Sequence, residues 1–324
     1  MKTSSRLLGA TLATFRERPR PWATPALMAL MALMALGMVV SGQTFAEQTL
    51  ADPAAPRVYR IGNSLTWDSQ PKAIEALAAQ RGLEHLEAYH INCGKSLERI
   101  WTHPEEVCVP VVEPFGTFGK ALPDHDWDAV TFQPHPGAGS TLATDSARIV
   151  DFIGKTRAGN RNGKTVFYIY APWPGQGLGP FHEVWIRDTP DADDTPTIQT
   201  QAYFDHLLRR VRAKTDADVR MIPAGHVLAE LDRRMRAGQV AGYSSAADLY
   251  RDVVHLNHVG RFTAGVTTFA TLYGQDPKGL ECPPQHYGGG KDFTPELYAT
   301  IHNAAWTVLT DLAPATGVTR VEAD

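Results

Sequence analysis

The sequence predicts an α/β protein with a mostly parallel sheet that is covered by helices on both sides. Two observations support this fold class. Short apolar runs alternate along the chain with stretches of helical length and helical spacing, which is the order expected of βαβ units. One of the runs, residues 165–170 (TVFYIY), is continuously apolar, as is typical of a parallel strand that is buried on both faces.

Five strands are expected, and helical patterns lie between and after them. The expected strands are residues 57–61, 86–91, 127–133, 165–170 and 219–222. The expected helices are residues 71–80, 96–101, 141–156, 197–214, 224–237, 262–273 and 294–312. Because ligands of such sheets bind beyond the carboxyl ends of the strands, residues that carry chemistry are expected directly after strands.

Two segments interrupt this alternation. Residues 103–126 and 172–196 are long, rich in proline and without sustained periodicity. Long irregular segments in compact domains are often lids or binding loops. The alternative is that these two segments only decorate the surface. No internal repeat and no linker divides the chain after residue 46, so residues 47–324 are expected to form one domain.

Residues 1–46 have the pattern of a secretory signal peptide. Five basic residues and one acid precede an apolar run at residues 26–40, and the small-residue ending Thr44-Phe45-Ala46 follows. The run is short for a membrane span, which needs about 20 residues, so export without stable membrane insertion is expected. The sequence has a net charge of −4, and losing this segment, with its net of +4, leaves −8. An acidic protein is a poor candidate for binding nucleic acid.

Three cysteines follow this segment: Cys93, Cys108 and Cys282. Export permits one disulfide and leaves one thiol, and the sequence does not select among the three possible pairs. Their spacing fits no zinc motif, and neither a metal nor a cofactor is expected. The oligomeric state has no sequence signal.

A candidate nucleophile follows the first expected strand, in Ile61-Gly62-Asn63-Ser64-Leu65-Thr66. Gly62 and Asn63 allow a tight turn, which would place Ser64 at the carboxyl end of the strand. A serine alone means little, because its hydroxyl is a weak nucleophile that needs a neighbouring base.

The candidate base is His255, three residues after Asp252. In a turn, this spacing lets the carboxylate hold one imidazole nitrogen while the other faces the serine. A capping aspartate and a histidine at a helix entry would give the same pattern. His255 and His258 also have the spacing of metal ligands, but no third ligand accompanies them at a sensible distance.

Together these motifs resemble the SGNH/GDSL hydrolase superfamily, in particular its bacterial branch with a GNSLT start. The resemblance implies a flavodoxin-like αβα sandwich, with Ser64 as the nucleophile and Asp252 and His255 as its partners. It also implies an oxyanion hole made by the backbone of Ser64 and of Gly94, which follows the second strand, and by a residue after the third strand. An α/β-hydrolase is excluded because the Ser64 motif lacks the second glycine of a G-x-S-x-G elbow.

Gln133 departs from the pattern of this family, which has an asparagine after the third strand. Glutamine keeps the amide donor and extends it by one methylene, and an oxyanion donor must lie about 2.7–3.1 Å from the developing charge. Additional candidates for substrate binding are His135, after the third strand, and Trp173 and His182, in the second insertion. Loop or core packing would explain the same three residues.

The resemblance and the expected export imply a serine ester hydrolase that deacetylates an extracellular carbohydrate. Two other activities remain open, a lipase-like or aryl esterase on small acyl esters and a thioesterase. An alternative from another class is a carbohydrate-binding module on the same fold, which predicts a broken triad. The expected partner is therefore a small-molecule or glycan ester.

Overall fold

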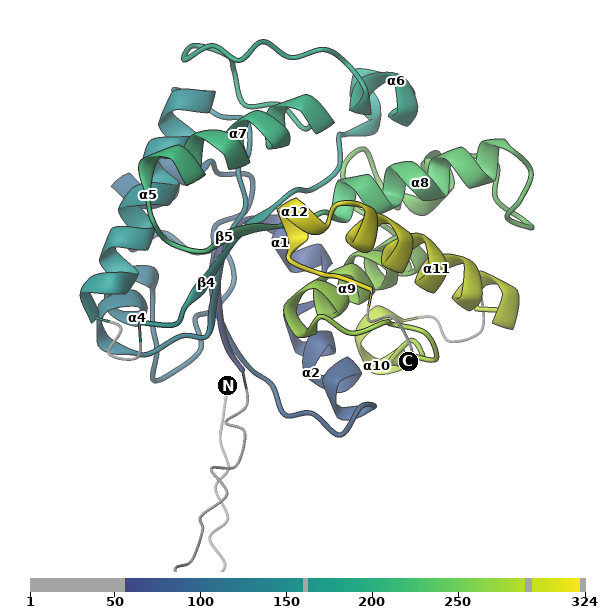
Figure 1. Ribbon diagram of the computed structural model, residues 1–324, viewed down its shortest axis with the longest axis horizontal. Helices are drawn as coiled ribbons and strands as arrows, with labels where there is room; N and C mark the ends of the chain where they lie inside the picture. The colour runs from purple at the N-terminus through teal and green to yellow at the C-terminus, as the bar shows by residue number, and fades with distance from the viewer. Residues whose placement is uncertain (1–55, 160–162, 289–292, 321–324) are drawn as a thin grey trace, which may run out of the picture. The chain divides into compact units, whose positions relative to one another are not determined.

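A computed structural model describes residues 56–159, 163–288 and 293–320. The expected signal peptide at residues 1–46 lies outside the described residues. One sheet organises the described chain, and its strands stand in the centre of Figure 1. The strands are β1 (Arg57–Gly62), β2 (Leu86–Ile91), β3 (Ala129–Phe132), β4 (Val166–Tyr170) and β5 (Val219–Ile222).

All five strands are parallel, in the order β2-β1-β3-β4-β5. This is the flavodoxin-like order, and it confirms the expected α/β sandwich, with a sheet that is wholly rather than mostly parallel. The order reverses between β1 and β3, whose register pairs Ile61 with Phe132. Ligands of doubly wound sheets bind at this point of reversal, beyond the carboxyl ends of the strands. Ser64 comes two residues after the end of β1, and Gln133 comes directly after β3, so both lie at this point of reversal.

Helices cover both faces of the sheet (Figure 1). On one side α5 packs against α3, α4 and α7, and on the other α9 packs against α2, α8, α10 and α11. The first group is α3 (Leu97–Thr102), α4 (Phe118–Asp124), α5 (Leu142–Gly159) and α7 (Gln201–Lys214). The second group is α2 (Pro71–Ala79), α8 (Ala224–Arg236), α9 (His258–Tyr273), α10 (Pro284–Tyr287) and α11 (Pro295–Asp311). None of the described helices is long and apolar enough to cross a membrane.

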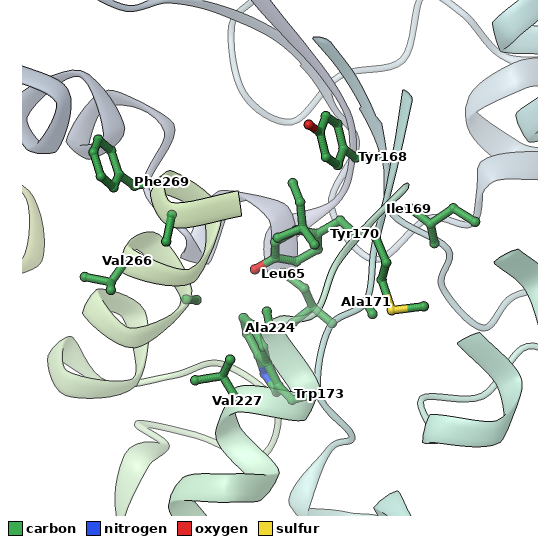
Figure 2. Close-up of a cluster of buried hydrophobic side chains, with 14 of the residues drawn as sticks. Leu65, Tyr168, Ile169, Tyr170, Ala171, Trp173, Ala224, Val227, Val266 and Phe269 are labelled. Carbon is green, nitrogen blue, oxygen red and sulfur yellow. The ribbon is translucent and has the colours of Figure 1, made fainter. Parts of the chain in front are cut away.

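The core lies on both faces of the sheet because most strand residues are apolar and buried, although Arg60 of β1 and His90 of β2 are buried as well. Figure 2 shows one part of it, where β4 meets α8 and α9. Tyr170 of β4 and Phe269 of α9 are completely buried there, together with Leu65 of the short helix α1 (Ser64–Asp68). The helix that bears the candidate nucleophile is therefore anchored in the core by its second residue.

Capping residues explain where two expected helices differ from the observed ones. α7 begins later than expected because the Thr200 hydroxyl accepts a hydrogen bond from the Tyr203 N–H and so caps the helix. α9 begins earlier than expected because the Asn257 side chain accepts from the N–H groups of Val259 and Gly260. Both caps are polar residues, so the apolar periodicity from which the helices were predicted gave no sign of them.

The two irregular segments contain short helices that the sequence pattern did not predict. Residues 103–126 include α4, whose buried Phe118 and Leu122 pack with the helix against α5. Residues 172–196 include a 3₁₀ turn η1 (Gln176–Leu178) and α6 (Phe181–Trp185), which packs on α8. The remaining short elements are η2 (Ala246–Leu249) and α12 (Ala313–Thr316). Both irregular segments thus add to the core as well as to the surface.

Candidate active site

Ser64 is the first residue of α1, and Asn63 alone separates it from the end of β1. Asn63 caps the helix, because its side chain accepts a hydrogen bond of 3.0 Å from the Leu65 N–H. Gly62 cannot carry a side chain, since a Cβ there would lie 2.2 Å from the Thr66 hydroxyl oxygen. The sharp turn therefore requires this glycine, and it presents the half-buried Ser64 beyond the end of the sheet.

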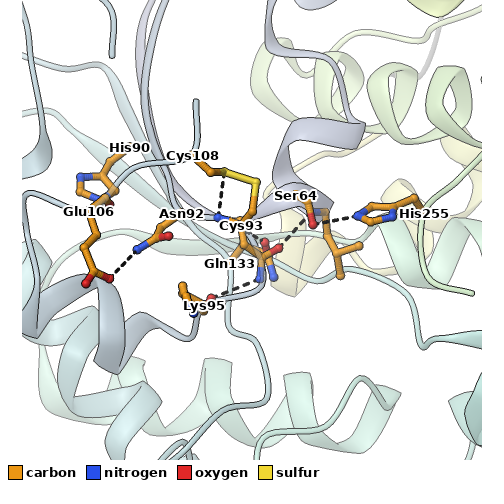
Figure 3. Close-up of a disulfide and its surroundings, with 11 residues drawn as sticks. Ser64, His90, Asn92, Cys93, Lys95, Glu106, Cys108, Gln133 and His255 are labelled. Atoms are coloured by element: carbon orange, nitrogen blue, oxygen red, sulfur yellow. Dashed lines mark hydrogen bonds between the residues drawn. A yellow bond between two sulfur atoms is a disulfide. The ribbon is translucent and has the colours of Figure 1, made fainter. Parts of the chain in front are cut away.

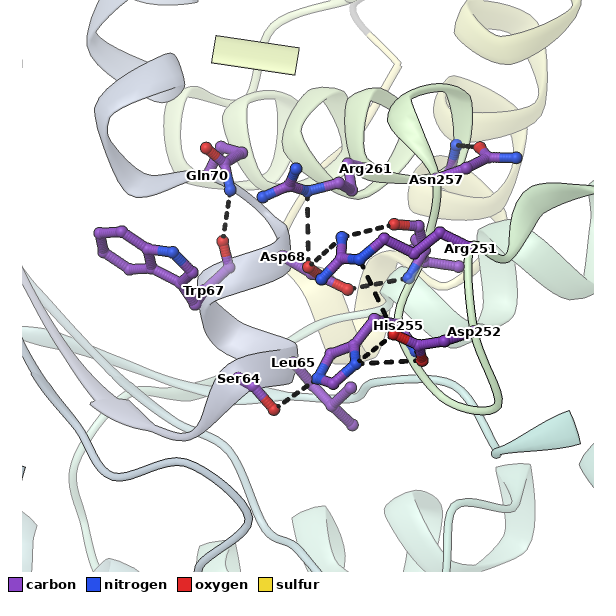
Figure 4. Close-up of polar contacts among 12 residues, drawn as sticks. Ser64, Leu65, Trp67, Asp68, Gln70, Arg251, Asp252, His255, Asn257 and Arg261 are labelled. Carbon is purple, nitrogen blue, oxygen red and sulfur yellow. Dashed lines mark hydrogen bonds and ion pairs between the residues drawn. The ribbon is translucent and has the colours of Figure 1, made fainter. Parts of the chain in front are cut away.

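His255 and Asp252 meet Ser64 in the arrangement of a catalytic triad (Figure 4). The His255 Nε2 lies 2.9 Å from the Ser64 Oγ, and the His255 Nδ1 lies 3.0 and 3.1 Å from the two Asp252 carboxylate oxygens. Asp252 also accepts hydrogen bonds from the His255 and Val254 N–H groups, which lower its pKa to about 2. The carboxylate is therefore ionised at neutral pH and holds the imidazole with its second nitrogen toward the serine.

Asp68, at the other end of α1, fastens this helix to the loop that carries the triad (Figure 4). Its buried carboxylate accepts a hydrogen bond of 2.9 Å from the Leu256 N–H and lies 3.1 Å from Arg251 and 3.4 Å from Arg261. Burial raises the pKa of Asp68, against the opposing effect of the Leu256 N–H and the two guanidinium groups. Asp68 thus helps to hold Ser64 and His255 close together, although they are far apart in sequence.

Trp173 supports the same loop from the inside of the protein. It is completely buried, and its indole N–H donates a hydrogen bond of 2.8 Å to the Val254 carbonyl. A ligand beside Ser64 cannot touch a fully buried ring, so Trp173 does not belong to the substrate-contacting residues expected from the sequence. Trp173, which follows β4, is therefore part of the core, and it makes one hydrogen bond to the loop that carries Asp252 and His255.

Gly94 lies in the turn after β2, and this turn is tied to the residue before Ser64. The Asn63 amide donates to the Lys95 carbonyl at 3.2 Å, and Gly94 has a φ of +67° that favours glycine. Neither the Ser64 N–H nor the Gly94 N–H donates a hydrogen bond to another residue that the structure describes. Two unused backbone donors at the switch point have the character that an oxyanion hole requires.

A disulfide between Cys93 and Cys108 closes this turn from outside (Figure 3). The Cys93 N–H additionally donates to the Cys108 sulfur at 2.9 Å. Of the three pairings left open by the sequence, the structure has this one, and Cys282 is a buried free thiol. The bond attaches the segment after α3 to the residue that directly precedes Gly94.

Gln133 is buried, and its amide is occupied by the turn that bears Ser64 (Figure 3). Its Oε1 accepts from the Asn63 N–H at 3.0 Å and from the Thr66 hydroxyl at 3.1 Å, while its Nε2 donates to the Pro134 carbonyl at 2.8 Å. A backbone N–H can only donate, so the bond to Asn63 assigns which amide atom is the oxygen. The longer side chain thus reaches across to brace the turn that bears Ser64, a role that the sequence did not indicate.

The two histidines expected to contact substrate lie in different places. His135 is close to the triad: burial lowers its pKa to about 4, and the charge of His255 contributes to the shift. Its Nδ1 is buried without a hydrogen-bond partner in the described chain. His182 lines a separate cavity between α6 and α8, whose lining residues do not include Ser64, Asp252 or His255.

His258 has no part in the triad. It is the first residue of α9, and its ring packs against Phe293 with the centroids 6.1 Å apart. Among the described residues, no group of three or more His, Cys, Asp and Glu side chains is arranged to hold a metal ion.

Sequence reasoning missed the residues that position the triad, chiefly Asp68, Arg251 and Arg261. Asp68 follows Ser64 by four residues, which places both on one side of a helix. The short α1 was not expected, however, so this spacing carried no signal.

The fold and the site together define a flavodoxin-like α/β protein that carries a Ser–His–Asp constellation at the switch point of its sheet. The crystal structure of a DUF4886 family protein from Bacteroides uniformis is similar, with a TM-score of 0.54 and 19% sequence identity, over 81% of this chain and 96% of that one. Protein YxiM from Bacillus subtilis is less similar, with a TM-score of 0.42 and 10% identity over 67% of this chain and 55% of that one. The first likeness concerns the fold alone, and the second is too low to support an argument. No protein-family model and no curated protein sequence matches the chain.

Proposed function

We propose that the protein is a serine ester hydrolase that acts through an acyl-enzyme and deacetylates an extracellular carbohydrate. The observation that carries the proposal is the contact of 2.9 Å between the Ser64 Oγ and the His255 Nε2, with Asp252 on the opposite imidazole nitrogen. A serine and a base within hydrogen-bond reach, with the base oriented by a carboxylate, is the arrangement of nucleophilic acyl transfer. The resemblance of the motifs to SGNH/GDSL hydrolases supports the same reaction.

In the proposed reaction, His255 takes the Ser64 proton while the Ser64 oxygen attacks the carbonyl carbon of the ester. Asp252 stabilises the imidazolium that forms, and the N–H groups of Ser64 and Gly94 stabilise the oxyanion of the tetrahedral intermediate. His255 then returns the proton to the alcohol as the ester C–O bond breaks, which leaves Ser64 acylated. Water, deprotonated by His255, then attacks the acyl carbon. The bond between this carbon and the Ser64 oxygen breaks, His255 returns the proton to Ser64, and the acid is released.

The surroundings of Gly94 offer groups that suit a carbohydrate. A hollow of about 560 Å³ adjoins Gly94, and its lining includes the side chains of Lys95, Glu98, Arg99 and His103 together with a larger area of apolar atoms. The four side chains can form hydrogen bonds with sugar hydroxyls, and the apolar area can pack against the C–H face of a sugar ring. The Cys93–Cys108 disulfide supports the expected export, because such bonds persist in oxidising compartments.

Hydrolysis of p-nitrophenyl acetate by wild type and Ser64→Ala tests the proposal. The wild type should turn over this ester, and the folded variant should lose at least about 10³-fold in kcat, because triad members act as a unit. A phenylmethylsulfonyl fluoride adduct should map to Ser64 by mass spectrometry, and EDTA should leave the rate unchanged. A folded Ser64→Ala protein with wild-type turnover would refute the proposal, as would an enzyme that resists the sulfonyl fluoride and is inactivated by EDTA.

A further inference from the structure

The helices α6 and α8 pack against each other (Figure 1). A second candidate site is a cavity that residues of both helices line, and its lining contains no residue of the triad. This cavity has a volume of about 590 Å³, within the range of small-molecule sites. The lining combines aromatic rings, from Phe181 and Tyr250, with polar side chains, from His182, Asp232 and Arg236. The triad, the oxyanion-hole candidates and the hollow beside Gly94 use none of these residues.

Asp232 is the central polar group of this cavity, and one of its two oxygens lacks a hydrogen bond. Its side chain is only 2% exposed, and Oδ1 accepts from the Ala246 N–H at 2.7 Å. Oδ2 is buried and has no hydrogen-bond partner in the described chain. The nearest donors are the Arg236 Nη1 at 3.7 Å and the His182 Nδ1 at 3.8 Å, both beyond hydrogen-bond length. The Arg236 and His182 side chains are 44% and 37% exposed, so a ligand hydroxyl that displaces one of them can donate to Asp232 and accept from the other.

A second cavity of about 600 Å³ adjoins the first and shares His182, Asp232 and Arg236 with it. Its wall contains His226, which is 7% exposed and has no hydrogen-bond partner on either ring nitrogen in the described chain. Burial lowers the pKa of His226 to about 4, so at neutral pH the ring offers one donor and one acceptor. Trp185 packs edge-on against this ring, with the centroids 4.9 Å apart.

The chemistry of these groups selects a ligand class. The negative charge of Asp232 faces the positive charge of Arg236, and Glu230 pairs with Arg233 in the second cavity, so most charges of the lining have an opposite charge beside them. Both donors and acceptors are present, which suits hydroxyl groups because each can both donate and accept. Aromatic rings beside them offer apolar surface for the C–H face of a sugar ring. Two adjoining cavities have room for more than one sugar unit.

We propose that these two cavities form a saccharide-binding site for sugar units that lie outside the ester of the substrate, with Asp232, Arg236, His182 and His226 as its polar contacts. The proposal rests on the proposed function, which it deepens. The site is linked to the triad loop: the Gln176 N–H donates to the Val253 carbonyl at 2.8 Å, and the Tyr250 hydroxyl donates to the Pro174 carbonyl at 2.7 Å. Sugar units bound here would therefore lie against segments that are hydrogen-bonded to the loop that carries Asp252 and His255.

The test compares wild type with His182→Ala/Arg236→Ala, whose replaced side chains are 37% and 44% exposed and so can be removed without opening the core. Asp232→Asn is a second variant, because it keeps the shape of the buried group. Arg234→Ala is the control, since Arg234 is on the same helix and lines neither cavity. The probes are neutral xylo-, cello-, manno- and chito-tetraoses for binding, measured by NMR titration, and their acetylated forms and p-nitrophenyl acetate for kinetics.

At least one tetraose should bind wild type and the control, and both site variants should weaken this binding by about tenfold or more. KM for its acetylated form should rise by a similar factor, while kcat/KM on p-nitrophenyl acetate stays at the wild-type value. Failure of all four tetraoses to bind at about 10 mM, or equal binding by wild type and both site variants, would overturn the site. Loss of the p-nitrophenyl acetate reaction in wild type would instead overturn the proposed function, and the NMR titration would still decide on the site.

Discussion

Replacing Cys93 and Cys108 with serine should weaken the folded state and the candidate oxyanion hole together. The two cysteines are 15 residues apart, and a cross-link closing a loop of this length removes chain entropy that is worth about 3 kcal/mol at 25 °C. In the folded protein the bond attaches the segment after α3 to the turn that contains Gly94. Without the disulfide, the hydrogen bond from Asn63 to Lys95 remains to hold this turn.

The free energy of unfolding should therefore fall by about 3 kcal/mol, and kcat on p-nitrophenyl acetate by about tenfold or more. The full loss of one oxyanion donor, about 10²–10³ in kcat, is the upper limit, because the turn keeps its bond to Asn63. Urea unfolding gives the first quantity and steady-state kinetics the second. Dithiothreitol should bring the wild type to the values of the double variant and leave the variant unchanged.

Cys282→Ser is the matched control, because this cysteine is buried and not cross-linked. It should not change the response of the protein to dithiothreitol. Equal unfolding free energies for wild type and the double variant would show that Cys93 and Cys108 do not stabilise the fold by a covalent bond. A large loss of stability with unchanged kcat would separate the disulfide from the oxyanion hole and contradict the assigned role of Gly94.

Three further predictions concern the triad, its support and the pH dependence of stability. Asp252→Asn should fold and lose about 10³–10⁴ in kcat, because an amide no longer selects the required tautomer of the base. Gln133→Ala should lower the unfolding free energy by about 1–3 kcal/mol and should also lower kcat, since it leaves the Asn63 N–H and the Thr66 hydroxyl without their shared acceptor and so loosens the turn that bears Ser64. Stability should fall as the pH drops from about 6.5 towards 4, by up to about 1.4 kcal/mol per pH unit for each histidine that burial keeps neutral. Five such histidines have pKa values lowered to about 3 or 4: His85, His90, His135, His226 and His302.

The sign of the pH effect follows from the lowered pKa values. In the unfolded chain these imidazoles gain protons below about pH 6.5, while the folded protein resists protonation, so acid favours unfolding. Asp145 opposes the trend, because burial raises its pKa to about 6. Its contribution to the stability of the folded protein is therefore lost as the pH rises through that value. Urea unfolding at pH 7 and pH 5 measures the balance, and a protein as stable at pH 5 as at pH 7 would contradict it. For the other two predictions, near-wild-type kcat in folded Asp252→Asn or Gln133→Ala would remove that residue from its assigned role.

The pattern of apolar residues was sufficient for the sheet. The expected strands at residues 86–91 and 219–222 coincide with β2 and β5, and the other three differ from the observed strands by a few residues at their ends. Buried parallel strands and amphipathic helices follow from neighbours within a few positions, so the sequence contains their signal. The short helices α1, α4 and α6 have too few turns to show a period, and they were not predicted.

The sequence predicted which residues form the triad and their order along the chain. It did not predict how these residues are arranged in space. Ser64 and His255 are 191 residues apart, and their hydrogen bond depends on Asp68, which fastens α1 to the loop before α9. Nothing in the local sequence marks Asp68 for this task, because its partners come from Arg251, Leu256 and Arg261. The resemblance to a known family supplied the pairing that local physics could not.

The sequence by itself determined the strands, most of the helices, and a serine and a histidine-bearing turn at the carboxyl side of the sheet. Tertiary structure alone decided that Cys93 bonds Cys108, that Gln133 braces the turn before Ser64, that Trp173 is buried, and that Asp232 faces a cavity without a partner for one oxygen. The physical reason is the range of the interactions. Backbone preference and apolar periodicity act between near neighbours, whereas burial and side-chain partners depend on segments that meet only when the whole chain packs.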